Sequence, residues 1–320
     1  QFFFTDPYDL TVLRPEDIIF TNTLSPFTNL SYYKTFDSRN GEERFKSYFA
    51  INANKRFGVG FYIDYLYGRG LYASQSTAFF NGGLFASYRG DKYNMHFIFN
   101  NDNLKMAENG GIADDRYITN PLDMAEGKKE YKSYDIPTNL NKVWNHNTSY
   151  HVFMTQRYNL GFHKEKIDSV TKDSVRIIQE FVPVTSFIHT LQVDLNGRKY
   201  ISYDDEQNQK YFEHNYLGND SIDKPRRSSI KNTIGISLHE GFNKWAKAGL
   251  TAFMSYEYRN FTLTDTTDVP KERRLGHYKE SVLSIGGELS KRQGKLLHYN
   301  ILGELAIAGE DNSILKAMEI

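Results

Sequence analysis

The stretch FKSYFAINANKRFGVGFYIDYLY, residues 45–67, decides the fold because its side chains alternate face by face across a short charged turn. Before Lys55 and Arg56, one face carries mainly apolar side chains, from Phe45 to Ile51, and after the turn the same pattern resumes. Period-two alternation is typical of strands, so the stretch predicts a β-hairpin. Each strand has about ten residues, the length that a tilted strand needs to cross a bilayer core. An apolar face opposite a polar one is what a barrel in lipid with a wet interior requires.

The composition is unusual for a soluble domain. The 320 residues include 23 Tyr and 23 Phe but only 2 Trp, and aromatic residues make up 15% of the chain, although the mean hydropathy is -0.59. In a transmembrane barrel, half of each strand faces water and aromatic residues gather at the two membrane interfaces, so a polar average and an aromatic excess coexist. A large soluble β-sandwich or a β-solenoid is the alternative that composition and periodicity leave open.

Several classes of function have no support in these residues. Lys and Arg together number 39, as do Asp and Glu, and no basic stripe interleaved with aromatic residues occurs, so no nucleic-acid partner is predicted. The chain has no Cys, which excludes disulfides and thiolate metal ligands. No hydrolase, metalloprotease or phosphate-loop motif occurs, so we expect neither an enzyme nor an organic cofactor. No metal site is predicted, because His96, His151 and His298 lie on separate candidate strands without the short spacing of metal ligands.

Period-two alternation predicts about twelve strands, and no apolar run is long enough for a membrane helix. The connections between these strands sort into two alternating kinds. Short charged ones lie at 55–56, 89–92, 240–244 and 291–295, and longer ones lie at 68–77, 102–143, 204–229 and 260–279. This alternation is typical of outer-membrane barrels, which have short periplasmic turns and long external loops. The segment 163–181 is predicted to break the rule, as a long connection on the periplasmic side.

The pattern divides the chain into three parts. Residues 1–27 are expected to form an N-terminal periplasmic or lead-in segment, residues 28–309 the barrel strands, and residues 310–320 a tail that fits no strand. The longest connection, 102–143, is the predicted pore constriction or surface cap, because long loops in compact domains are usually functional.

Several strings of residues resemble a known family. They are Thr21-Asn22-Thr23, Pro26 to Lys34, Phe49 to Lys55, Ile63 to Tyr67, Gln75 to Ala78 and Asn109 to Pro121, with thinner likeness at 182–190 and 288–296. Through them the chain resembles the putative porin family of Bacteroidota outer membranes. The resemblance implies an all-β fold, a transmembrane antiparallel up-and-down β-barrel of the outer-membrane type, located in the cell outer membrane. Family members are longer, with further strands after the position of Glu310, so the chain is expected to cover only part of the barrel.

Polar side chains on the face opposite the apolar one are candidates for lining a pore. These candidate pore-lining residues are Asn52, Asn54, Asp64, Asn94, His96, Asn100, His151, Arg157, Glu257, Glu288, His298, Asn300 and Glu304. They predict a weakly polar pore of mixed charge. Alternatively, they only satisfy one another inside a plugged or wide barrel.

The leading functional hypothesis is a porin-like channel for passive diffusion of small hydrophilic solutes. Its expected partners are the lipid bilayer, lipopolysaccharide and the solutes. The alternative is a membrane-embedded barrel subunit of a larger assembly, with a closed lumen and other outer-membrane proteins as partners. A barrel enzyme, the third hypothesis, would require a Ser, a His and a carboxylate to converge at one rim.

Overall fold

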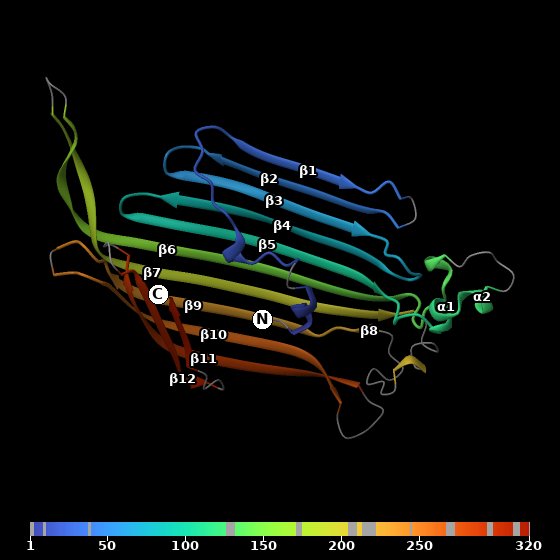
Figure 1. Cartoon of the computed structure of the whole chain (residues 1–320). Coiled ribbons are helices and arrows are strands. Elements are labelled where there is room, and N and C mark those ends of the chain that lie inside the picture. The colour runs from blue at the N-terminus through green and yellow to red at the C-terminus, as the bar shows by residue number, and fades with distance from the viewer. Residues whose placement is uncertain are drawn as a thin grey trace.

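The computed structural model describes residues 3–8, 11–37, 40–125, 132–170, 175–203, 210–212, 222–243, 245–266, 273–292, 297–309 and 314–319. Most of them belong to one antiparallel sheet of 13 strands (Figure 1). The strands are β1 (Phe27–Lys34), β2 (Glu42–Asn52), β3 (Phe57–Gly68), β4 (Ser76–Arg89), β5 (Tyr93–Glu108), β6 (Val143–Val170), β7 (Val175–Ser202), β8 (Ile222–Asp223), β9 (Arg226–Leu238), β10 (Gly249–Thr266), β11 (Arg273–Lys291), β12 (Tyr299–Gly309) and β13 (Ile314–Glu319). Short helical elements are η1 (Phe3–Tyr8), η2 (Pro15–Asp17), α1 (Arg116–Thr119), α2 (Pro121–Met124) and η3 (Ser133–Asp135).

The strands follow one another across the sheet in the order in which they occur in the chain. Their order is β1-β2-β3-β4-β5-β6-β7-β9-β10-β11-β12-β13, and the short β8 pairs with β7 beside this path. All pairings are antiparallel, which confirms the predicted all-β, up-and-down arrangement. The sheet is open, with β1 and β13 at its edges. In the described part of the chain, no helix is both long and apolar enough to cross a membrane.

The hairpin predicted over residues 45–67 is present, formed by β2 and β3. β2 and β3 pair with Phe49 opposite Phe61, and the two rings stack with their centroids 5.5 Å apart. The tight connection is closed by Asn54, whose side-chain oxygen accepts hydrogen bonds from the backbone nitrogens of Arg56 and Phe57 at 2.8 and 2.9 Å. An Asn side chain that forms a hydrogen bond with the backbone about two residues later is common in turns.

Two segments that the sequence predicted as connections are largely strand, and a third is shorter than predicted. β10 and β11 occupy most of 260–279, and β6 and β7 pair through most of 163–181. The predicted loop 102–143 is shortened at its start, because β5 continues to Glu108 and β6 begins at Val143. The prediction of a long connection at 163–181 is wrong, because its many charged residues are typical of a loop. In the structure, opposite charges pair between the strands instead, as Lys166 and Glu180 do at 3.0 Å. Such pairs between strands are stabilising. The β6–β7 hairpin therefore projects beyond its neighbours, at the left of Figure 1.

The prediction that residues 310–320 fit no strand is wrong for residues 314–319, which form β13. This strand pairs with β12 from Leu305 opposite Ile314 to Asn300 opposite Glu319. An edge strand is held by main-chain hydrogen bonds on one side only, so it needs little of the two-faced pattern that sequence reasoning looks for.

One break in the alternation has a packing explanation. Phe253 on β10 interrupts an otherwise polar face, and it lies between two glycines, Gly235 on β9 and Gly286 on β11. A Cβ atom added to Gly286 would lie 2.2 Å from the tip of the Phe253 ring. The ring therefore occupies the space that the missing side chain leaves.

Replacing Gly286 by Ala should therefore be costly. We expect Gly286→Ala to destabilise the folded protein by about 1–3 kcal/mol, because it overpacks this contact. The matched control is Gly303→Ala on β12, where an added Cβ meets nothing within 4 Å. Equilibrium unfolding in urea measures both variants, and equal stabilities would contradict this account of Phe253.

Candidate pore-lining face

The two faces of the sheet show a pattern of burial opposite to that of a soluble protein. On β9, Ile234 and Ile236 are 60% and 50% exposed, whereas Ser229 and Ser237, on the opposite face, are buried. Soluble domains normally bury isoleucine and expose serine. We name the face of Ser229 the inner face and the face of Ile234 the outer face.

The inversion recurs across the sheet, except on β3, β4 and β5, where Tyr62, Phe85 and Ile98 are buried on the inner face. Exposed apolar side chains on the outer face include Leu84, Tyr150, Tyr158, Leu160, Phe187, Leu195, Ile230, Leu250, Met254 and Ile285. Buried polar side chains on the inner face include Asn81, Asn100, Asp102, Ser149, Asn159, Ser186, Asn196, Ser255 and Ser284. A contiguous exposed apolar surface of this kind marks a membrane or protein contact.

The inner face is covered by the chain's own N-terminal segment, the described residues among 3–24. Figure 1 shows this dark blue segment crossing the sheet in front of β4 to β9. Leu13, Ile18 and Phe20 pack against a buried cluster that includes Tyr62 and Phe85. The segment therefore buries the apolar side chains of the inner face, as a hydrophobic core does in a soluble protein.

Further contacts fix both ends of the segment. Near its start, Tyr8 packs edge-on against Phe79 with the ring centroids 5.6 Å apart. At its end, the Thr23 backbone nitrogen donates to the Asn52 side-chain oxygen at 2.9 Å. The segment is thus attached from β2 to β5, and it reaches β7 where the Arg198 guanidinium lies 4.7 Å from the centre of the Phe4 ring.

Hydrogen bonds hold the middle of the segment to the strands. The hydroxyl of Tyr48 donates to the carbonyl of Ile19 at 2.7 Å. The side-chain amide of Asn100 donates to the carbonyl of Leu13 at 2.5 Å and its oxygen accepts from the Tyr62 hydroxyl at 2.5 Å. Asn100 is fully buried, so it links the segment to two strands in a site shielded from water.

Asn100→Ala should loosen this attachment. Removing a buried partner leaves the Tyr62 hydroxyl unsatisfied, at a cost of about 1–3 kcal/mol. We expect faster protease cleavage between residues 11 and 24 in the variant, measured by limited proteolysis of the folded protein. Asn101→Ala, one position along on the outer face, is the matched control, and a similar increase there would contradict the proposed link.

A cavity of about 570 Å³ lies between the N-terminal segment and the inner face. Among the residues that line it are Arg14, Glu16, His96, His151, Asp194 and Arg227. Its charged groups are of both signs. The described residues of the long connection 109–142 do not line this cavity, which is bounded by the N-terminal segment and the strands.

Of the thirteen candidate pore-lining residues, eleven belong to strands and lie on the inner face. They are Asn52, Asp64, Asn94, His96, Asn100, His151, Arg157, Glu257, Glu288, Asn300 and Glu304. Asn54 lies in the β2–β3 turn, and His298 precedes β12. These eleven side chains therefore lie on the face of the sheet that the alternation predicted. Their role in lining a pore stays a prediction.

Most of the charged candidates are paired with neighbours on the same face. Asp64 lies 2.8 Å from Arg44, and Glu304 lies 3.5 Å from Lys231. Glu257 contacts both Arg259 and Arg227, at 2.9 and 3.5 Å, while His151 contacts Asp194 at 2.7 Å. Pairing on this scale leaves a polar surface with little net field.

Sequence reasoning missed the basic members of these pairs. Arg227 fell within the predicted loop 204–229, although it lies on β9, and Lys231 was not singled out on a strand that was predicted. The period-two pattern, carried two steps further toward the N-terminus from Lys231 through Ser229, would have placed Arg227 on the inner face. No pattern in the sequence indicated that residues 3–24 cover that face.

The fold and this face define a class: an antiparallel up-and-down sheet whose covered inner face is polar and whose outer face is apolar. The chain belongs to the family described as "Putative porin", whose model matches residues 1–318 and so covers almost the whole chain. The predicted family is thereby confirmed. No curated protein and no solved structure shows significant similarity to the chain.

Proposed function

We propose that the chain forms a porin-like β-barrel of the outer membrane that admits small hydrophilic solutes by passive diffusion. The observation that carries the proposal is the inverted burial of the sheet, with serine and asparagine shielded inside and isoleucine and leucine exposed outside. Family membership supports the same assignment. The proposal needs no catalytic step.

The dimensions of the outer face fit a bilayer. On β6, the outward-facing side chains from Tyr150 to Tyr158 are apolar or aromatic except for Gln156, whose side-chain oxygen accepts a hydrogen bond from the Tyr93 hydroxyl at 2.8 Å. Leu160, the next outward-facing residue, is ten steps of about 3.3 Å from Tyr150, or about 33 Å along the strand. At a strand tilt of about 40° this is about 25 Å along the membrane normal, the height of the apolar band in outer-membrane barrels. Tyrosines near both ends of the band match the aromatic girdles of such barrels.

The inner face supplies the proposed path for solutes. Its paired charges favour a water-filled passage with weak charge selectivity, because neither sign dominates. The N-terminal segment lies in this passage and narrows it. We therefore assign the constriction to residues 3–24 and not to the connection 102–143.

The same segment favours a second function. Since it buries Asn100 and Asp102, it supports the alternative of a barrel with a closed lumen that serves as a subunit of an outer-membrane assembly. Other outer-membrane proteins would then be its partners.

Single-channel recording separates these two functions. The full-length protein is reconstituted into a planar bilayer, and currents are compared for salts and for a series of neutral solutes of increasing size. Ohmic steps of reproducible size, with solute exclusion above one size, support a diffusion channel. An inserted but silent protein contradicts it and favours the assembly subunit, for which copurifying proteins are the next test.

A further inference from the structure

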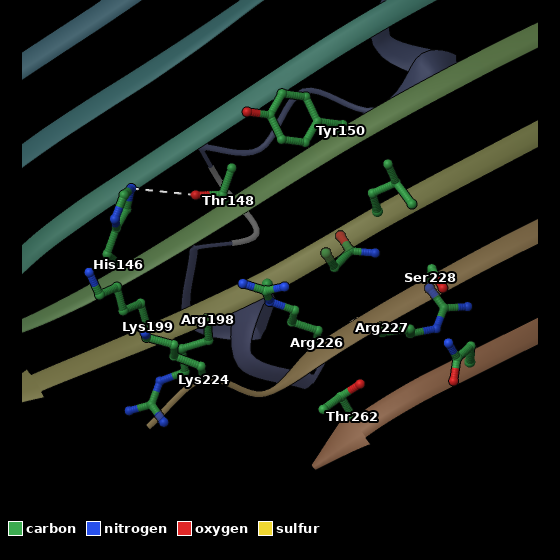
Figure 2. Close-up of a pocket in the computed structure, with 14 residues that line it drawn as sticks. His146, Thr148, Tyr150, Arg198, Lys199, Lys224, Arg226, Arg227, Ser228 and Thr262 are labelled. Atoms are coloured by element: carbon green, nitrogen blue, oxygen red, sulfur yellow. Dashed lines mark hydrogen bonds between the residues drawn. The ribbon is translucent and has the colours of Figure 1, made fainter. Parts of the chain in front are cut away.

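A second cavity, of about 680 Å³, opens on the outer face, away from the proposed solute path. It lies over β6, β7, β9 and β10, near the end of the sheet that carries the long connections, and Figure 2 shows the residues around it. Because the N-terminal segment lies on the other face, this cavity belongs to a different surface of the molecule.

A missing side chain creates the hollow. Gly197 on β7 lies directly between Thr148 on β6 and Arg226 on β9 in the outward-facing row. A Cβ added to Gly197 would come no closer than 3.8 Å to Arg226. The space above this glycine is therefore open, and its walls are the neighbouring side chains.

The walls at the long-connection end are basic. His146 and Lys199 are opposite each other in the register, and Lys224 and Arg226 lie beside them (Figure 2). Lys199, Lys224 and Arg226 make no ion pair within the described part of the chain. The described carboxylate of this region, Asp223, pairs with Arg198 on the inner face at 3.7 Å.

The opposite wall is apolar. Tyr150 and Leu195, which pair across β6 and β7, line the cavity on the side toward the apolar band and are both exposed. The cavity thus joins an apolar surface to a cluster of basic side chains, because Tyr150 and His146 on β6, like Leu195 and Lys199 on β7, are four residues apart. This is the chemistry of a lipid at an interface, with acyl chains on one side and an anionic headgroup on the other.

We propose that this cavity binds the phosphate groups of a phosphorylated membrane lipid in the leaflet next to the long connections. The proposal rests on the proposed function, because the outer face meets lipid only if the chain is a membrane barrel. Lys199, Lys224 and Arg226 bind the phosphate, and His146, whose Nε2 lies 2.7 Å from the Asn103 side-chain oxygen, forms one side of the site. The first acyl carbons pack on Tyr150 and Leu195. Basic residues near a membrane surface attract anionic headgroups in this way.

The test measures lipid retention by the folded full-length protein in phosphatidylcholine nanodiscs, with bisphosphorylated lipid A as the probe. Lipid bound after detergent extraction is counted by native mass spectrometry, and a dephosphorylated lipid A and inorganic phosphate serve as comparison ligands. Lys199→Gln/Lys224→Gln/Arg226→Gln removes the cations. Lys55→Gln/Lys92→Gln/Lys247→Gln removes equal charge at the opposite end of the sheet. Gly197→Leu fills the hollow and keeps every charge.

We expect the wild type and the opposite-end control to bind lipid A about tenfold or more tightly than the triple variant at the cavity. Gly197→Leu should lose lipid A binding to a similar degree. This result would distinguish binding in the cavity from non-specific electrostatic attraction to the basic side chains. Equal binding by the triple variant, undiminished binding by Gly197→Leu, or equal binding of the dephosphorylated lipid would each overturn the proposal. Competition by inorganic phosphate at equal concentration would overturn the assignment to a lipid.

Heat-dependent migration on gels shows that each variant has folded before binding is compared. The same nanodisc preparation, fused to a planar bilayer, reports conductance. A conducting protein without lipid A preference overturns this inference alone, whereas a silent protein that retains lipid A overturns only the proposed channel. A protein that does not insert overturns both.

Discussion

Deleting residues 1–24 should raise the single-channel conductance by about threefold or more, because conductance grows with the free cross-section of a pore. The segment packs along β2 to β5 and reaches β7, so its removal uncovers this part of the inner face. The strands keep their backbone pairing, since the segment belongs to none of them. Conductance is measured in planar bilayers, after gel migration has shown that the truncated barrel folds.

The matched comparison removes residues 114–136 from the long connection. The backbone nitrogen of Ala113 and the carbonyl of Pro137 lie 2.9 Å apart, so a short glycine linker can replace the residues between them. We expect this deletion to leave conductance unchanged. A large increase here, with none on removal of residues 1–24, would place the constriction in the loop, as the sequence first suggested.

Ile234→Arg should prevent or strongly impair folding into membranes, although Ile234 is 60% exposed. On the surface of a soluble protein, such a change costs little. At the middle of a lipid-facing strand, an arginine costs about 2–4 kcal/mol, which shifts the folding equilibrium by a factor of about 30 to 1,000. The measurement is urea titration of folding into phosphatidylcholine vesicles.

The neighbouring residue provides the control. Thr233 lies on the inner face, opposite Thr190 and Ser255, so Thr233→Arg places the same charge in the proposed aqueous passage. We expect this variant to fold nearly as well as the wild type. Equal tolerance of both variants would mean that the outer face does not meet lipid, and the proposal of a membrane barrel would fail.

The strands and their facing were predictable because they depend on local alternation. Tyr62 and Phe61 are adjacent, yet one is buried against the inner cluster and the other stacks on Phe49 at the outer face, as period two requires. The ends of strands were less predictable. Charged residues such as Lys166 read as loop until their partner on the next strand is known, and that pairing is a property of the hairpin.

The covering of the inner face could not be predicted from pattern at all. Leu13, Ile18 and Phe20 form no regular period, and their binding surface is assembled from strands that lie far along the chain. Contacts between Asn100 and the carbonyl of Leu13 depend on three-dimensional approach alone. For this reason the sequence predicted the constriction in the loop 102–143. In the structure, the N-terminal segment lies on the inner face instead.

The position of this segment also has a consequence for the order of assembly. Tyr8 rests on Phe79 and Leu104, and Phe4 rests on Arg198, so the surface that receives the beginning of the chain exists only after β4 to β7 have paired. These residues precede all the strands of the sheet in the chain, but they can dock only after β4 to β7 have paired. Until then, their apolar side chains stay exposed, and Phe20 can pack against Phe85 and His96 only once β4 and β5 lie side by side.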